Sequence, residues 1–309
     1  MFFFCYMKDL FFFYARRSMG FVAMPFVGWL YSTPMLMRNA LLVLVLAMAA
    51  HSQWLNEAKS GVPRTRDGKP DLAARTPRAN GKPDFTGLWQ PDIAKPGEID
   101  RLIPGLSAFT VPGDDPTTFS RYFFDVLADA RAGEIKLAPE AEKILQANLA
   151  LGDTNGPRCL PASLPMADMF PSPKRIVHTR DLIVVLYEGD LPRQIHMDGR
   201  RLPKDPQPAW AGYSVAKWEG DTLVVDTVGF NERAPLDGMG HPRSGALRMV
   251  EKMRRPDYGH MDVEVTMEDA AYYSKPIVFR YRQTLVPDDD LLEWVCTENE
   301  KDGVHMRVN

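Results

Sequence analysis

The sequence has few cysteines, no excess of basic residues and none of the common cofactor-binding motifs. Its 309 residues include three cysteines and carry a formal net charge of −3. This charge argues against a nucleic-acid-binding protein, so DNA and RNA are not expected partners. A P-loop, an HExxH helix and a dinucleotide-binding glycine motif are missing, so no cofactor is predicted. His178 and His196 lack an acidic third ligand, so no metal is predicted either.

An apolar run near the N-terminus is too short to span a membrane. Residues 40–50 are apolar, follow Arg38 and lead into Ala50-His51-Ser52, as in a secretory signal peptide. A spanning helix needs roughly 20 apolar residues. We therefore predict a leader over residues 1–52 and a periplasmic or secreted mature protein without a stable membrane span. Residues 1–34 fit a start codon assigned too early; the alternative is a true membrane anchor over residues 20–50.

Removing this leader leaves two cysteines, Cys159 and Cys296. It also removes four basic residues and one acidic residue, so the formal net charge falls from −3 to −6. An even pair of cysteines in an exported chain predicts a disulfide. The loop that it closes would contribute about 4 to 5 kcal/mol in the chain-entropy model. The alternative is two buried free thiols.

The tetrapeptide GKPD occurs twice, at residues 68–71 and 81–84. Two copies without a hydrophobic face cannot form a solenoid, which needs three or more units that share a core. The glycines and prolines instead predict an extended, turn-rich arm over residues 53–84.

Helical periodicity is confined to residues 118–151. Phe119, Tyr122, Phe123 and Val126 recur at spacings of three and four, as in an amphipathic helix. A second helix is expected to begin at Pro139 and to end before Gly152. We predict that the two helices form an insert in a larger fold.

From Arg175 onward the apolar residues alternate with polar ones, which is typical of strands with one solvated face. With an earlier strand around Leu88, about ten short strands are expected, at 88–90, 175–178, 182–188, 193–197, 212–218, 222–230, 247–253, 260–269, 277–286 and 291–298. Gly87-Leu88-Trp89 resembles the G-x-W signature of lipocalins, whose tryptophan closes one end of a barrel. The predicted fold is therefore mainly β: an antiparallel, lipocalin-like (calycin-type) β-barrel of about ten strands with a two-helix insert, in a single domain over residues 85–309.

The loop over residues 231–246 is longer than ordinary hairpin loops and concentrates polar side chains. Asp237 could fix the tautomer of His241, and the two would then form an acid–base pair. Asn231 or Arg233 could stabilise developing negative charge beside them. The alternative is a structural loop whose side chains bond backbone amides.

A second polar group lies on the predicted strands. Tyr187, Glu188, Arg193 and Trp218 are the expected contacts of a ligand inside the barrel. Arg193 opposite Glu188 across a hairpin predicts an ion pair between them, worth less than about 1 kcal/mol if it is exposed.

The chain resembles a large, functionally uncharacterised family of exported bacterial proteins. The motifs that carry the resemblance extend from Gln53 to Asp302: QWLN, the doubled GKPD, RCLP at 158–161, RQIHMDGR at 193–200, WEGDTLVVDTVGFN at 218–231, GHP at 240–242 and CTENEKD at 296–302. The resemblance implies export and a mature chain that begins at Gln53. Relatives usually have a second histidine where this chain has Arg243, which counts against a two-histidine mechanism.

Three functions are compatible with these patterns. The first is an exported barrel that binds a small, partly apolar ligand, with residues 231–246 as a lid. The second is a hydrolase, lyase or isomerase that uses His241 and Asp237. The third is a structural protein of the bacterial envelope.

Overall fold

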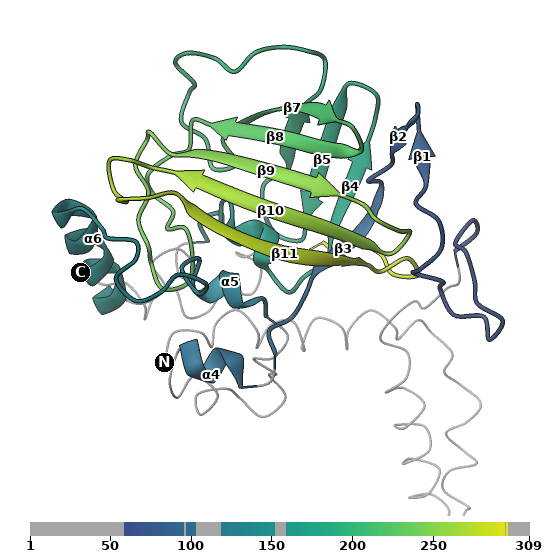
Figure 1. Cartoon of the computed structure of the whole chain (residues 1–309), viewed down its shortest axis with the longest axis horizontal. Helices are drawn as coiled ribbons and strands as arrows, with labels where there is room; N and C mark the ends of the chain where they lie inside the picture. Colours follow the sequence, from purple (N-terminus) through teal and green to yellow (C-terminus); the bar gives the residue numbers. More distant parts are fainter. Residues whose placement is uncertain (1–58, 96, 103–118, 152–158, 294, 296–309) are drawn as a thin grey trace, which may run out of the picture.

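Nine strands close into one barrel in this computed structural model, which describes residues 59–95, 97–102, 119–151, 159–293 and 295 (Figure 1). The order around the barrel is β10 (His260–Glu268), β11 (Ile277–Leu285), β3 (Gly87–Pro91), β4 (Lys174–His178), β5 (Leu182–Tyr187), β6 (Arg193–His196), β7 (Tyr213–Glu219), β8 (Thr222–Val228) and β9 (Arg248–Arg254). The predicted mainly β barrel is confirmed. The expected tenth strand is not seen in its described part, since Leu291–Glu293 are not in a strand.

The strands follow the alternation in the sequence. On β10 the side chains of Met261, Val263, Val265 and Met267 are buried, and those between them are partly exposed. Successive side chains of a strand point to opposite faces, so this pattern turns one face of the strand toward the interior of the barrel. β11 shows the same alternation over nine residues.

One neighbouring pair departs from the antiparallel prediction, because β6 and β7 are parallel. Parallel neighbours need a crossover of a dozen or more residues, whereas antiparallel ones need only a tight turn. Residues 197–212 supply this crossover and include Pro203, Pro206 and Pro208. Parallel and antiparallel strands have the same two-residue alternation of side chains, so this alternation could not show the direction of β7. Only the length of the connection indicated a parallel pair.

The arm, residues 59–84, packs against one end of the barrel, which we call the arm end (Figure 1). Its second GKPD copy forms a hairpin of β1 (Arg78–Ala79) and β2 (Lys82–Pro83), with positive φ at Asn80 and Gly81. Such a turn needs two residues that tolerate left-handed backbone, and Asn-Gly supplies them. The hairpin is held by ion pairing between Arg78 and Asp221 of the β7–β8 turn.

Aromatic side chains fill the arm end. Trp89 is fully buried, donates its indole N–H to the Phe85 carbonyl at 2.9 Å and lies under the Arg255 guanidinium. Phe85 stacks on Trp218 with ring centroids 5.7 Å apart. Trp89 thus lies at one end of the barrel, where the G-x-W resemblance led us to expect it. The arm itself is joined to this end by backbone hydrogen bonds from Tyr258 and Gly259 to the carbonyls of Ala74 and Leu72.

Short helices lie at the opposite end, which we call the loop end because it carries residues 231–247. They include α5 (Arg121–Phe124), the 3-10 helix η4 (Met166–Met169) and α6 (Pro139–Leu151), in addition to α4 (Glu98–Leu102) nearby. The second predicted helix begins at Pro139 as expected. The first is a single turn, α5, whose Tyr122 ring stacks on Phe279 of β11 at 4.5 Å. Packing against the barrel, rather than helix length, explains the apolar spacing of residues 119–126.

Several expectations fall outside the described residues. The leader over residues 1–52 lies there, and so does Cys296. Cys159 is not a free thiol, but its pairing with Cys296 stays a prediction. Among the helices of the described residues, none is long and apolar enough to cross a membrane.

Candidate functional site

Asp237 and His241 are brought together at the loop end. The Nδ1 atom of His241 lies 2.7 Å from Oδ2 of Asp237. Asp237 is fully buried and also accepts hydrogen bonds from the backbone N–H groups of Val126 and His241. These donors hold the carboxylate in one orientation, so the imidazole is held with Nε2 directed away from Asp237.

The electrostatic environment favours the protonated imidazole. Burial alone would lower the pKa of His241, but the charge and hydrogen bond of Asp237 outweigh it and raise the pKa above its ordinary value. Asp125, whose carboxylate is 4.0 Å from the ring, acts in the same direction. A histidine whose pKa lies above 6.5 can donate a proton at neutral pH and take it back, which is what a general acid–base catalyst requires.

Asp125, Asp237 and His241 are also a possible metal-binding group, because one ligand-type atom of each lies within 4.8 Å of the others. No metal was predicted from the sequence. The hydrogen bonds favour the acid–base arrangement: both Asp237 oxygens already accept N–H groups, and Nδ1 of His241 faces one of them. A metal at this position would have to replace these contacts.

Asn231 and Arg233 do not join this pair. Asn231 Oδ1 accepts the backbone N–H of Arg233 at 3.0 Å, and its carbonyl accepts the Arg243 guanidinium at 2.7 Å. Arg233 is exposed. Within the described residues, neither is hydrogen-bonded to His241 or Asp237, so their expected role beside the acid–base pair has no geometric support.

Arg243 holds the loop in place. It is 1% exposed and donates to the carbonyls of Asn231 and Leu164 and to Ser163 Oγ. With no carboxylate beside it among the described residues, burial lowers its pKa to about 10. Ser244 adds two hydrogen bonds to Asp269, each 2.7 Å long. The long loop is therefore anchored at several points, which argues against a freely hinged lid.

A second group of polar side chains lies inside the barrel, and we call it the interior network. Its members are all buried or half-buried: Asp168, Lys174, Tyr187, Arg193, Ser214, Thr227 and Glu251. Arg193 makes a bidentate ion pair with Glu251, in which two guanidinium nitrogens each donate to one carboxylate oxygen. It also donates to the hydroxyls of Ser214 and Thr227. This bidentate geometry is the strong form of an arginine–carboxylate pair.

The predicted ion pair between Arg193 and Glu188 is therefore wrong. The register places Arg193 opposite Val185, with its side chain directed into the barrel. Glu188 lies beyond the end of β5, where its carboxylate accepts the backbone N–H of Leu292. The error has a simple cause: a hairpin partner depends on loop length, and Glu188 lies three residues beyond Val185, the true register partner of Arg193.

The 3-10 helix η4 contributes the other carboxylate of the interior network. Asp168 Oδ1 lies 2.6 Å from Lys174 Nζ and accepts the Tyr187 hydroxyl at 2.9 Å. Burial lowers the pKa of Lys174 even though Asp168 opposes it. For Asp168, burial would raise the pKa, but Lys174 and Arg193 lower it. Each carboxylate thus lies against a cation, as buried charges require.

Tyr281 and Gln283, on the inner face of β11, extend this polar surface. Gln283 is 1% exposed, and its Nε2 lies 3.2 Å from the Tyr281 hydroxyl. Its Oε1 has no hydrogen-bond partner among the described residues. Because the two ends of a side-chain amide can exchange, either the oxygen or the NH₂ group is left unpaired.

The four residues expected to contact the ligand do not lie at one place. Tyr187 and Arg193 both belong to the interior network, because they share Asp168 as a partner. The Tyr187 hydroxyl donates to the Asp168 carboxylate, and Arg193 lies 3.7 Å from the same carboxylate. Trp218 lies four residues beyond Ser214 along β7, or about 13 Å of strand, in the aromatic cluster of the arm end. Glu188 lies outside both groups.

Sequence reasoning missed Lys174, Glu251 and Gln283, although a signal was present. On β9, Met249, Glu251 and Met253 share the inward face, so the glutamate occupies a position where an apolar residue is expected. Gln283 follows Phe279 and Tyr281 in the same way. A polar residue at an inward position of a strand marks a buried polar site. Asp168 gave no such signal, because η4 is too short to show a repeating pattern of apolar and polar residues.

No family model, curated protein or solved structure matches the chain.

Proposed function

We propose that this protein binds one small, partly apolar molecule inside its barrel, as an exported binding protein of the bacterial envelope. The polar end of the molecule lies at the interior network, and its apolar part lies along the inner faces of β10 and β11. Barrels of this strand number hold one small ligand in known families.

The composition of the interior supports this proposal. Met261, Val263, Val265 and Phe279 supply an apolar surface, and Arg193, Tyr187 and Gln283 supply a few fixed polar groups. An apolar lining with convergent polar groups is the usual composition of a small-molecule site. Because the buried charges of the interior network pair with one another, the expected ligand is neutral and polar at one end, rather than ionic.

The single observation that carries the proposal is the unpaired end of Gln283. A buried polar group without a partner costs about 1 to 3 kcal/mol, so its presence needs an explanation. A hydroxyl, amide or carbonyl group of a bound molecule would satisfy it.

Native mass spectrometry of the full chain, purified from a bacterial envelope extract, tests the proposal. We expect a population with added mass, which denaturation releases as a small molecule. Gln283→Leu should raise the dissociation constant about tenfold and so lower the occupied fraction, because it removes the group that pairs with the ligand.

Thr284→Val is the matched control. Thr284 is the next residue on β11, and its hydroxyl bonds Asp92 on the outer face. The control variant should keep the wild-type occupancy. An unoccupied wild-type protein, or equal occupancy in the Gln283 and wild-type proteins, would refute the proposal.

A second candidate function is acid–base catalysis at His241, with Asp237 as the residue that orients it. The observation that favours it is the 2.7 Å contact to a fully buried carboxylate, which holds the imidazole in a fixed position. The reaction would be one that needs proton transfer at neutral pH, as in a hydrolase, lyase or isomerase.

The co-purified molecule is the substrate to use for this test. We expect His241→Ala to lower its turnover by about 100-fold or more. His260→Ala is the matched control, because His260 pairs with Asp257 at 2.8 Å but lies at the arm end. Unchanged turnover in His241→Ala would end the catalytic role of this residue and leave the binding proposal standing.

A further inference from the structure

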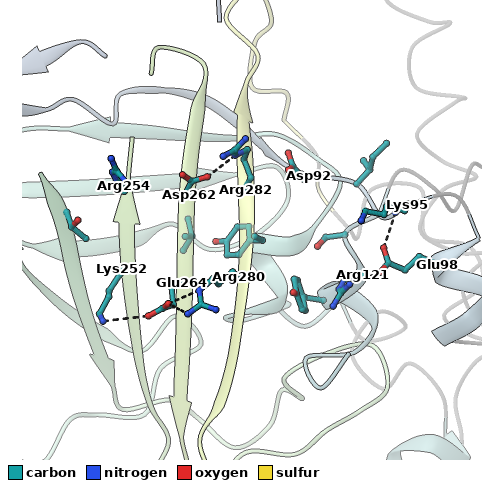
Figure 2. A pocket seen from close by; sticks show the side chains of 16 residues that line it. Asp92, Lys95, Glu98, Arg121, Lys252, Arg254, Asp262, Glu264, Arg280 and Arg282 are labelled. Atoms are coloured by element: carbon teal, nitrogen blue, oxygen red, sulfur yellow. Dashed lines mark hydrogen bonds and ion pairs between the residues drawn. The ribbon is translucent and has the colours of Figure 1, made fainter. Parts of the chain in front are cut away.

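The polar side chains on the two faces of β11 differ in how many partners they have. On the outer face, Arg282 donates to the Asp262 carboxylate of β10 at 2.8 Å (Figure 2). On the inner face, Tyr281 and Gln283 are 9% and 1% exposed. Within the described part of the chain, the only hydrogen bond of these two side chains is the one between them, which is 3.2 Å long. We call Tyr281 and Gln283 the inner pair, and it keeps hydrogen-bonding groups that are not yet used.

The interior network does not supply the missing partners. Both carboxylate oxygens of Glu251 accept from Arg193, and the Asp168 carboxylate accepts from Lys174. Among the described residues, no hydrogen bond joins these groups to the inner pair. The buried charges are therefore matched with one another, while the uncharged groups beside them are not.

The inner pair offers one donor and one acceptor whichever way the Gln283 amide is turned. If its NH₂ group donates to Tyr281, the amide oxygen is left as an acceptor and the tyrosine O–H as a donor. If the two ends of the amide are exchanged, the tyrosine donates to the amide oxygen. The NH₂ group is then left as a donor and the phenolic oxygen as an acceptor. The conclusion does not depend on the assignment of the amide.

The Tyr281 hydroxyl keeps its proton at neutral pH. Burial raises its pKa well above the ordinary value for tyrosine, and the negative charges of Asp168 and Glu251 act in the same direction. The proton that the inner pair needs as a donor is therefore present under ordinary conditions.

Only some ligand groups match one donor and one acceptor. A carboxamide or an alcohol both donates and accepts a hydrogen bond. A ketone, an ester or an ether only accepts, so it would leave the acceptor of the inner pair buried without a partner, which is unfavourable. A carboxylate also only accepts, and it brings a charge for which the interior network has no unpaired cation among the described residues.

We propose that the inner pair recognises the interior ligand through an uncharged group that both donates and accepts a hydrogen bond, namely a carboxamide or an alcohol. This inference rests on the proposed function, because it requires a ligand inside the barrel. It narrows the class of that ligand, since ketones, esters and carboxylates do not match Tyr281 and Gln283.

Octanamide and nonan-2-one are the probes for the test. They have nearly the same shape, because the NH₂ group of the amide replaces a methyl group of the ketone. Isothermal titration calorimetry of the ligand-free full chain measures both affinities. The wild-type protein should bind octanamide about tenfold more tightly, since the ketone leaves one group of the inner pair unpaired.

The double variant Tyr281→Phe/Gln283→Leu removes both polar groups of the inner pair. Its ratio of the two affinities should fall to about one or below, because a buried NH₂ group of the amide would then have no partner. Tyr213→Phe/Thr284→Val is the matched control. The Tyr213 hydroxyl accepts from Arg200 and the Thr284 hydroxyl donates to Asp92, both outside the barrel, so this variant should keep the wild-type ratio.

Three results would overturn the inference. Equal affinities of the wild-type protein for the two probes, or an amide preference that Tyr281→Phe/Gln283→Leu retains, would do so and leave the binding proposal standing. Binding of neither probe would also overturn it, and native mass spectrometry of the co-purified molecule would then decide the binding proposal separately.

Discussion

The inner and outer faces of β9, β10 and β11 carry ion pairs of the same chemistry in two different environments. Inside, Glu251 pairs with Arg193, and both side chains are about 3% exposed. Outside, Glu264 pairs with Arg280, whose side chain is 74% exposed. Water screens the outer pair and is excluded from the inner one. The comparison shows that burial, rather than the identity of the two residues, decides how much such an ion pair contributes to the stability of the fold.

The largest expected effect follows from breaking the inner pair. Glu251→Ala leaves the Arg193 charge buried without its main partner, which should lower the free energy of unfolding by about 3 to 5 kcal/mol. Urea denaturation of the variant and the wild type measures this difference. A loss below about 1 kcal/mol would mean that Asp168, at 3.7 Å from Arg193, compensates fully.

A second, smaller effect concerns pH and His241. Its folded pKa is raised by Asp237, so the native state binds the proton more tightly than the unfolded chain does. The extra stability is therefore present below pH 6.5 and is lost as the pH rises through the raised folded pKa, with a slope of at most about 1.4 kcal/mol per pH unit.

Denaturation of His241→Gln from pH 5 to pH 9 checks this expectation. The variant should lack the part of the pH dependence that His241 contributes, whereas His260→Gln at the arm end should retain it. Identical pH profiles for His241→Gln and the wild type would show that the Asp237 contact does not persist in solution.

The third effect has the opposite sign. Gln283→Leu removes a buried group with an unpaired end, so the ligand-free protein should become more stable by about 1 kcal/mol. Thr284→Val, on the outer face, should change stability by less than that. Thermal denaturation of ligand-free samples measures both. A destabilised Gln283→Leu protein would indicate that the amide is fully paired in solution, which would weaken the binding proposal as well.

The smallest effect is expected on the outer face. Glu264→Ala should lower the free energy of unfolding by less than about 1 kcal/mol, and by less still in high salt. The same urea denaturation as for Glu251→Ala measures it. Equal losses for the two glutamates would contradict the comparison of the two faces.

Much of this architecture could be predicted because its signals are local. The alternation from Met261 to Met267 set the inward face of β10, and Glu219-Gly220-Asp221 marked the turn between β7 and β8. The pairing of Asp237 with His241 was also predictable, since four residues of one loop separate them. Asn231 and Arg233 lie in the same loop, but its path carries them to other partners.

The parts that could not be predicted depend on contacts between distant segments. Asp168 and Lys174 join Glu251 and Arg193 only because η4 enters the barrel beside β4. An ion pair between Arg193 and Glu188 was predicted because the two-residue alternation of a strand does not show which residue of the neighbouring strand lies opposite.

By itself, the sequence determined that the chain is mainly β, which residues of each strand face inward, and which loop carries the histidine–carboxylate pair. These properties follow from periods and turns that span only a few residues. Only the tertiary structure decided that β6 and β7 run parallel, that the arm closes one end of the barrel, and that the buried charges form one network. The reason is that closing the barrel brings together side chains that are far apart in the chain. Local sequence patterns do not show which distant segments come into contact.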